Sequence, residues 1–109
     1  MSDILLVITN LPDAASAEKL ARSIIEERAA ACVNQLAPCT STYRWKNNIE
    51  TATEVPVLIK TTQGRYARLE KLIREAHPYE LPEIIAVPVT AGLPAYLHWI
   101  AGEIITPEE

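Results

Sequence analysis

Two long extended segments in the middle of the chain constrain its fold more than any other feature. They run from Cys32 to Trp45 and from Ile49 to Thr62, and the polar residues between them predict a tight turn. Arms of about 14 residues would span roughly 45 Å, whereas helices of about 15 residues cover only about 22 Å. About half of this central hairpin therefore has to extend beyond any helical layer of the same domain.

Both arms of the predicted hairpin contain a proline. With the turn centred near Asn47, Pro38 lies opposite Pro56. Because proline lacks a backbone N–H, both arms lose a ladder donor at this level, which indicates a bulge or a bend. Beyond it, Tyr43 and Trp45 lie either on a solvated, flexible hairpin or against a partner chain. Three copies around an axis would let each hairpin extend a neighbour's sheet, so we expect a homotrimer.

A strand and a helix precede the hairpin, and a helix and a strand follow it. The predicted elements are a strand over Ile4–Ile8, a helix with its N-cap at Asp13, a helix from Tyr66 to Ala76, a strand from Glu83 to Thr90, and a short C-terminal helix from Leu93 towards Gly102. This order predicts an α+β fold of the ferredoxin-like, split βαβ type. The length of 109 residues fits one domain, residues 1–109.

Charge and hydropathy exclude several classes of partner. The formal net charge is -4 and the basic residues are scattered among acids, so we expect no nucleic-acid partner. No apolar run approaches the roughly 20 residues needed to span a membrane, and Met1-Ser2-Asp3 does not begin like a signal peptide. The expected location is therefore the cytoplasm, without membrane association.

The nucleophiles and glycines of the chain do not predict an enzyme. There is no Ser/His/Asp order and no phosphate-binding loop among only three glycines. Cys32 and Cys39 would lie roughly 23 Å apart along a regular strand, too far for a disulfide, so both are predicted to be free thiols. We therefore expect a non-enzymatic protein.

The segment His77-Pro78-Tyr79-Glu80-Leu81-Pro82-Glu83-Ile84 has the densest side-chain chemistry of the chain. Its prolines disfavour helix at the residues that precede them, so the polar groups lie on a stiff loop. His77 is the best candidate metal ligand, together with Glu80, Glu83 or groups of a neighbouring subunit. The alternative is that its imidazole caps the second helix by donating to the terminal carbonyls.

Most aromatic residues lie outside the two long helices. Burial at a subunit interface is one explanation, since Tyr and Trp combine a large apolar area with a polar group. The other is a cleft between subunits that binds a small molecule. The candidate residues of this inter-subunit cleft are Tyr43, Trp45, Lys60, Tyr79, Glu83 and Trp99, with Glu54 nearby on the hairpin.

Five motifs in order resemble the CutA family of divalent-cation tolerance proteins. They are Arg28-Ala29-Ala30-Ala31-Cys32-Val33-Asn34, Ser41-Thr42-Tyr43-Arg44-Trp45, the segment from Glu54 to Thr62, His77 to Glu83, and Tyr96-Leu97-His98-Trp99-Ile100. The resemblance implies a ferredoxin-like protomer in a tight trimer similar to the PII signalling proteins. It also implies a role in tolerance of copper and other divalent cations. The rival interpretation is a PII-like regulatory module that binds a metabolite at subunit interfaces and signals to a partner protein.

The resemblance also implies a divalent metal ligand, with copper as the candidate. Of the ligands proposed for the family, this chain keeps only His77. Ile8 stands where some members have a cysteine at the end of the first strand, and Ala76 stands where they have a second histidine. A Cu(II) or Zn(II) site normally needs three or four donors, so His77 would require additional ligands.

Overall fold

The protein, analysed as a computed structural model, is described here over residues 3–105. In this range no helix is both long and apolar enough to cross a membrane. The elements in chain order are β1 (Ile4–Leu11), α1 (Ala14–Glu26), β2 (Cys32–Gln35), β3 (Cys39–Trp45), β4 (Asn48–Thr62), the short 3-10 helix η1 (Gln63–Arg65), α2 (Tyr66–Ala76), β5 (Ile84–Pro88) and α3 (Pro94–Glu103).

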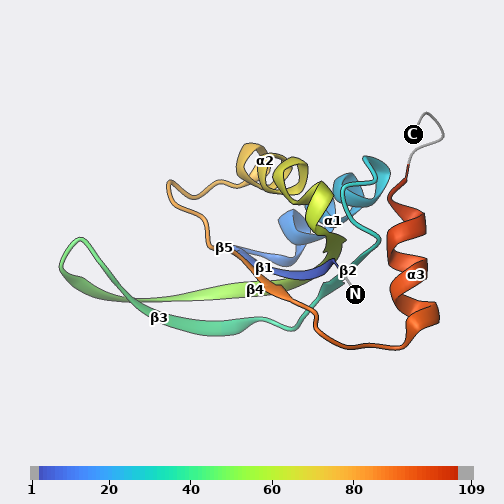
Figure 1. The fold of residues 1–109 in the computed structure, drawn as a ribbon. Helices are drawn as coiled ribbons and strands as arrows, with labels where there is room; N and C mark the ends of the chain where they lie inside the picture. The colour runs from blue at the N-terminus through green and yellow to red at the C-terminus, as the bar shows by residue number, and fades with distance from the viewer. Residues whose placement is uncertain (1–2, 106–109) are drawn as a thin grey trace.

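The strands form an antiparallel sheet with the order β2-β4-β1-β5, and β3 continues the pairing along β4. Helices α1 and α2 lie side by side on one face of this sheet (Figure 1). The order is that of a ferredoxin-like fold, which confirms the predicted α+β class. Asp13 is the N-cap of α1, as predicted, and its carboxylate accepts a hydrogen bond from the Ser16 backbone N–H at 2.7 Å.

The core lies between the two helices and the inner face of the sheet. Val7 pairs with Ile59 and Thr9 pairs with Val57, so these side chains share that face. Burying one such aliphatic side chain contributes about 1.5–3 kcal/mol. The apolar core side chains from these elements that are almost fully buried include Val7, Leu20, Ile24, Val57, Ile59, Leu69 and Ile73.

The hairpin contains the predicted bulge. Gln35 pairs with Val57 but Cys39 pairs with Glu54, so three residues of the first arm face two of the second. The Leu36 backbone N–H donates to the Pro56 carbonyl at 2.9 Å across this point. The bulge divides the predicted first arm, Cys32 to Trp45, into β2 and β3, as the two prolines indicated.

Beyond the bulge, the hairpin overhangs the rest of the domain. Lys46 and Asn47 form the turn with φ angles of 49° and 70°, as a two-residue type I′ turn requires. Pairing of β4 with β1 ends at Val55, so within the described residues Asn48–Glu54 pairs only with β3. Figure 1 shows β3 and this part of β4 projecting past both helices, as the arm lengths predicted.

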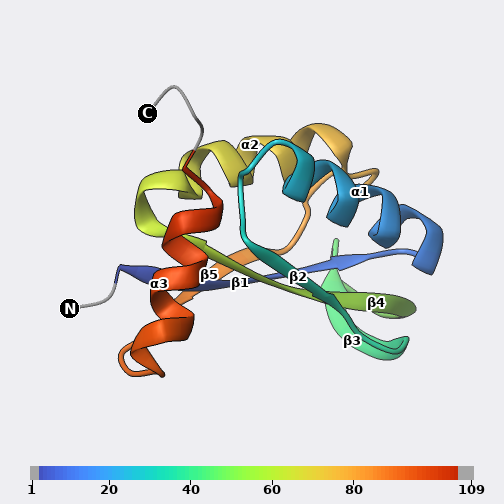
Figure 2. The same ribbon diagram turned by 90° about the vertical axis from the view of Figure 1, so that its right-hand side faces the viewer.

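Helix α3 packs against β1 and β4 at the end of the sheet away from the hairpin (Figure 2). Arg28 ties the end of this helix to the loop after α1. Its guanidinium donates to the carbonyls of Glu103 and Ile105, at 2.8 and 3.4 Å. Arg28 itself has a φ of 54°, the left-handed conformation that often ends a helix. The motif Arg28 to Asn34 therefore fixes the position of α3 as well as leading into β2.

The outer face of the sheet, opposite α1 and α2, carries an apolar stripe between α3 and the hairpin. The register places Ile8 beside Leu58 on one side and Ile85 on the other, and Leu6 beside Val87. Ile85 and Val87 are 50% and 45% exposed. A sheet face of this kind normally packs against another layer.

Candidate functional site

An open groove of about 1000 Å³ separates the overhanging hairpin from the loop that follows α2. Four of the six residues predicted for the inter-subunit cleft line it: Tyr43 and Trp45 on β3, and Tyr79 and Glu83 on the loop. Its lining residues are Ser41, Thr42, Tyr43, Trp45, Ala52, Glu54, Tyr79, Glu80, Leu81, Pro82, Glu83, Ile84 and Ile85.

Strand register explains why the hairpin side chains meet in this groove. Tyr43 and Trp45 are two residues apart on β3 and therefore share one face of the strand. Cys39 lies directly opposite Glu54, which puts Glu54 on that same face. Along β4, Glu54 lies on the face of Leu58 and, through β1, of Ile85. The groove is thus on the outer face of the sheet and shares Ile85 with the apolar stripe.

His77 holds the loop against the end of β1. The Tyr79 backbone N–H donates to Nδ1 of His77 at 3.2 Å, so Nε2 carries the proton and donates to the Asn10 carbonyl at 2.5 Å. The side chain is only 8% exposed. Both ring nitrogens therefore have backbone partners, and coordination of a metal by His77 would require breaking one of these bonds. The alternative prediction, that the imidazole caps α2, is wrong because the carbonyl acceptor belongs to Asn10 of β1.

Asn10 completes this connection. Its side-chain amide donates to a carboxylate oxygen of Glu83 at 2.8 Å, while its carbonyl accepts from His77. One residue at the end of β1 therefore positions both ends of the loop. Sequence reasoning did not select Asn10 because its partners are 67 and 73 positions away. No local pattern signals such contacts.

Tyr79 lies between His77 and Glu54. Its ring centroid is 4.5 Å from that of His77. Burial of the phenol, together with its hydrogen bond to the Glu54 carboxylate, raises the pKa of Tyr79 to about 12. Glu54 is itself only 8% exposed. The phenol is thus a neutral donor at neutral pH and joins the loop to the hairpin.

The raised pKa of Tyr79 predicts a late step in an alkaline titration. A phenol whose pKa is raised on folding stabilises the fold below its ordinary pKa near 10, and this contribution is lost as the pH rises towards 12. In absorbance at 295 nm, the difference between wild type and Tyr79→Phe should titrate near pH 12. Glu54→Gln should move that step to lower pH. A difference curve centred near pH 10 would contradict the contact.

Lys60 and Trp99, the other two residues predicted for the cleft, lie elsewhere in the protomer. The Lys60 ammonium lies 5.6 Å from the centroid of the Tyr96 ring on α3, and its Nζ is 3.4 Å from the Tyr96 hydroxyl. Tyr96 stacks on Trp99 with ring centroids 5.6 Å apart. This cluster joins β4 to α3, at the opposite end of the sheet from the hairpin. Within one protomer, the six residues thus form two separate groups.

The candidate metal donors do not converge. Within residues 3–105, no group of three His, Cys, Asp or Glu side chains is placed to hold a metal ion. Ile8 belongs to the apolar stripe and Ala76 is exposed at the end of α2. Cys32 and Cys39 are both free thiols, as predicted. Residues 3–105 of one protomer therefore do not bring together the donors that a Cu(II) or Zn(II) site needs.

The fold and the groove define a class of protein: a ferredoxin-like protomer with an overhanging hairpin that walls a groove on the outer face of its sheet. A profile of the family "CutA1 divalent ion tolerance protein" matches residues 5–103. Mouse Protein CutA is 45% identical over 89 residues, which are 82% of this chain and 50% of the mouse protein. This chain thus spans about half the length of that relative.

Solved structures agree with the profile. The crystal structure of CutA from Xylella fastidiosa matches 95% of this chain and 100% of its own, with a TM-score of 0.93 and 47% identity. The periplasmic divalent cation tolerance protein CutA from Archaeoglobus fulgidus matches with a TM-score of 0.90 and 31% identity, over 94% of this chain and 99% of its own. The chain belongs to the CutA family of divalent-cation tolerance proteins.

Proposed function

We propose that this chain acts in divalent-cation tolerance as a homotrimer that binds a small ligand in the groove between the hairpin and the loop after α2. The observation that carries the proposal is the convergence of Tyr43, Trp45, Tyr79 and Glu83 on this groove. Pockets with apolar walls and a few placed polar groups are typical ligand sites. Its action would then be regulatory, as in the PII-like interpretation, and not catalytic.

Two features of the protomer support the trimer. The apolar stripe on the outer face is half exposed at Ile85 and Val87, and β4 from Asn48 to Glu54 has β3 on one edge only within the described chain. Unpaired edges and apolar sheet faces favour association with another copy. In a closed ring, the Lys60 and Trp99 group of one subunit would be available to a neighbour's groove. Sedimentation should show about three times the 12.1 kDa of one chain at micromolar concentration.

Copper is the metal that the resemblance suggested, and His77 is the residue with which to test it. Since both of its nitrogens are hydrogen-bonded, we expect His77→Ala to bind Cu(II) in calorimetric titration as well as wild type does. The exposed His98 is the matched control, through His98→Ala. A tenfold weaker affinity for His77→Ala alone would make His77 a copper ligand, and the ligand-binding proposal would then give way to direct metal buffering.

We also propose a cytoplasmic location for this chain, although the Archaeoglobus relative is described as periplasmic. The support is that both Cys32 and Cys39 are free, with Cys39 exposed on the hairpin. Exposed thiols persist in a reducing compartment and tend to oxidise outside it.

A further inference from the structure

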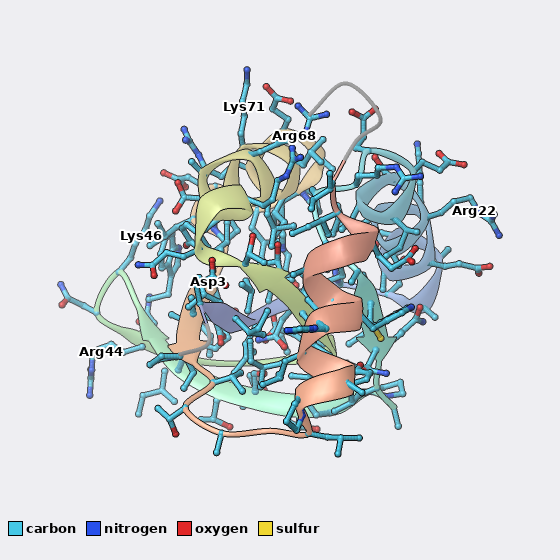
Figure 3. The ribbon with its side chains drawn as sticks, turned by 45° about the vertical axis from the view of Figure 1, so that its right-hand side comes forward. Asp3, Arg22, Arg44, Lys46, Arg68 and Lys71 are labelled. Carbon is cyan, nitrogen blue, oxygen red and sulfur yellow. The ribbon has the colours of Figure 1, made fainter. Side chains whose placement is uncertain are left out.

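The groove is acidic and aromatic. Its described lining residues include three carboxylates, Glu54, Glu80 and Glu83, and no Lys, Arg or His. Arg44 lies on β3 between Tyr43 and Trp45, and its side chain points outward from the hairpin in Figure 3. Lys46, in the turn of the hairpin, stands over the Trp45 ring with its Nζ 5.6 Å from the ring centroid. A groove with this charge favours a cationic occupant.

Glu54 is the strongest single indication. Glu54 lines the groove and is only 8% exposed. The neutral Tyr79 phenol donates to it, and no ion pair to Glu54 is present among the described residues. Removing a carboxylate from water costs several kcal/mol unless a cation or several donors compensate it. A cation bound beside Glu54 would supply that compensation.

The walls of the groove distinguish an organic cation from a metal ion. Tyr43, Trp45 and Tyr79 contribute aromatic rings, and Leu81 and Ile85 add aliphatic surface. Such walls gain from contact with an apolar body, and the face of an indole attracts an ammonium or guanidinium group. Lys46 already makes such a contact with the Trp45 ring. A hydrated metal ion would use none of this apolar surface.

We propose that the groove binds an organic cation, an ammonium or guanidinium group on an apolar or aromatic body. The charged group lies beside Glu54, within reach of Glu83, and the apolar body lies against Tyr43 and Trp45. The inference rests on the proposed function, since it names the chemical class of the ligand of the same groove. It differs from that proposal in requiring a positive charge on the ligand.

Three probes of similar size test this requirement: benzylamine, benzyl alcohol and benzoate. They differ chiefly in the charge at one end. The readout is calorimetric titration of the wild-type protein, which leaves Trp99 and its contact with Tyr96 unchanged. Titrated into the millimolar range, benzylamine should bind about tenfold or more tightly than benzyl alcohol, with benzoate weakest.

Variants that replace one glutamate by glutamine test which carboxylates contact the charged group. Glu54→Gln should weaken benzylamine about tenfold and leave benzyl alcohol unchanged, and Glu83→Gln should act in the same direction. Glu75→Gln, which removes the same charge from the exposed side of α2, is the matched control and should have no effect. Using two groove variants keeps the test valid if one of them fails to fold.

Each alternative outcome overturns the inference in a recognisable way. Equal binding of benzylamine and benzyl alcohol would show an apolar pocket, and tighter binding of benzoate would show an anion site. Displacement of benzylamine by Cu(II), sensitive to Glu54→Gln, would show a metal site. No response in a protein that sediments as a trimer would indicate that a neighbouring subunit fills the groove. These outcomes contradict the organic-cation inference but not the proposed homotrimer. A protein that sediments as a monomer would instead contradict the proposed function.

Discussion

If the chain forms the proposed homotrimer, Ile85→Asp is expected to convert it into a monomer at micromolar concentration. Ile85 lies on the outer face beside Ile8, with half of its side chain exposed in the protomer. A carboxylate buried in an apolar contact costs several kcal/mol, and a three-fold ring imposes that cost at every interface. Sedimentation velocity should therefore show one species at the mass of a single chain.

A matched control is available on α1. Ile25 is 42% exposed on the helical side of the protomer, so Ile25→Asp makes the same chemical change away from the outer face. It should sediment as wild type does, and circular dichroism of both variants verifies that each is folded. A trimeric Ile85→Asp protein would show that the outer face is not the interface.

The second large effect concerns His77→Ala, which should lower the free energy of unfolding by about 2–3 kcal/mol. The substitution removes a buried ring and both of its hydrogen bonds, which leaves the Asn10 carbonyl and the Tyr79 N–H without these partners. Urea unfolding at a fixed protein concentration measures the change, since association also contributes to stability.

The two histidines of the chain make this a controlled comparison. His98 is exposed on α3, so His98→Ala should change the free energy of unfolding by less than about 0.5 kcal/mol. His77→Asn should recover part of the loss, because an amide can both donate and accept. Equal effects at positions 77 and 98 would show that the contacts of His77 with β1 and Tyr79 contribute nothing to stability.

The sequence predicted most helices and strands correctly because the features that start and end them act over short stretches of the chain. The apolar run at the start of the chain, the N-cap at Asp13 and the turn at Asn47 each act over a few residues. The bulge was predictable since Pro38 and Pro56 each remove a donor. The last strand was predicted from Glu83 to Thr90 but pairs with β1 only over Ile84–Pro88.

The site was predicted less completely. The sequence selected Tyr79 and Glu83 for their chemistry, but their positions depend on Asn10, which is far away in the chain. Lys60 and Trp99 were grouped with them by residue type alone, and within one protomer tertiary packing places both beside Tyr96. Strand register and sheet order decide which residues line the same groove. Sheet order depends on contacts between residues that are far apart in the sequence.

The bulge at 36–38 also separates two kinds of strand pairing. They differ in the length of chain that has to form a loop before the strands can pair. On one side, β3 and β4 are joined by a two-residue turn, so their pairing closes a very short loop at small entropic cost. On the other side, the pairing of β1 with β4 joins segments that α1 and the first arm of the hairpin separate. Contacts of this second kind are what slow the folding of β-rich domains. The overhanging hairpin can therefore form early and on its own, ahead of the sheet that holds it.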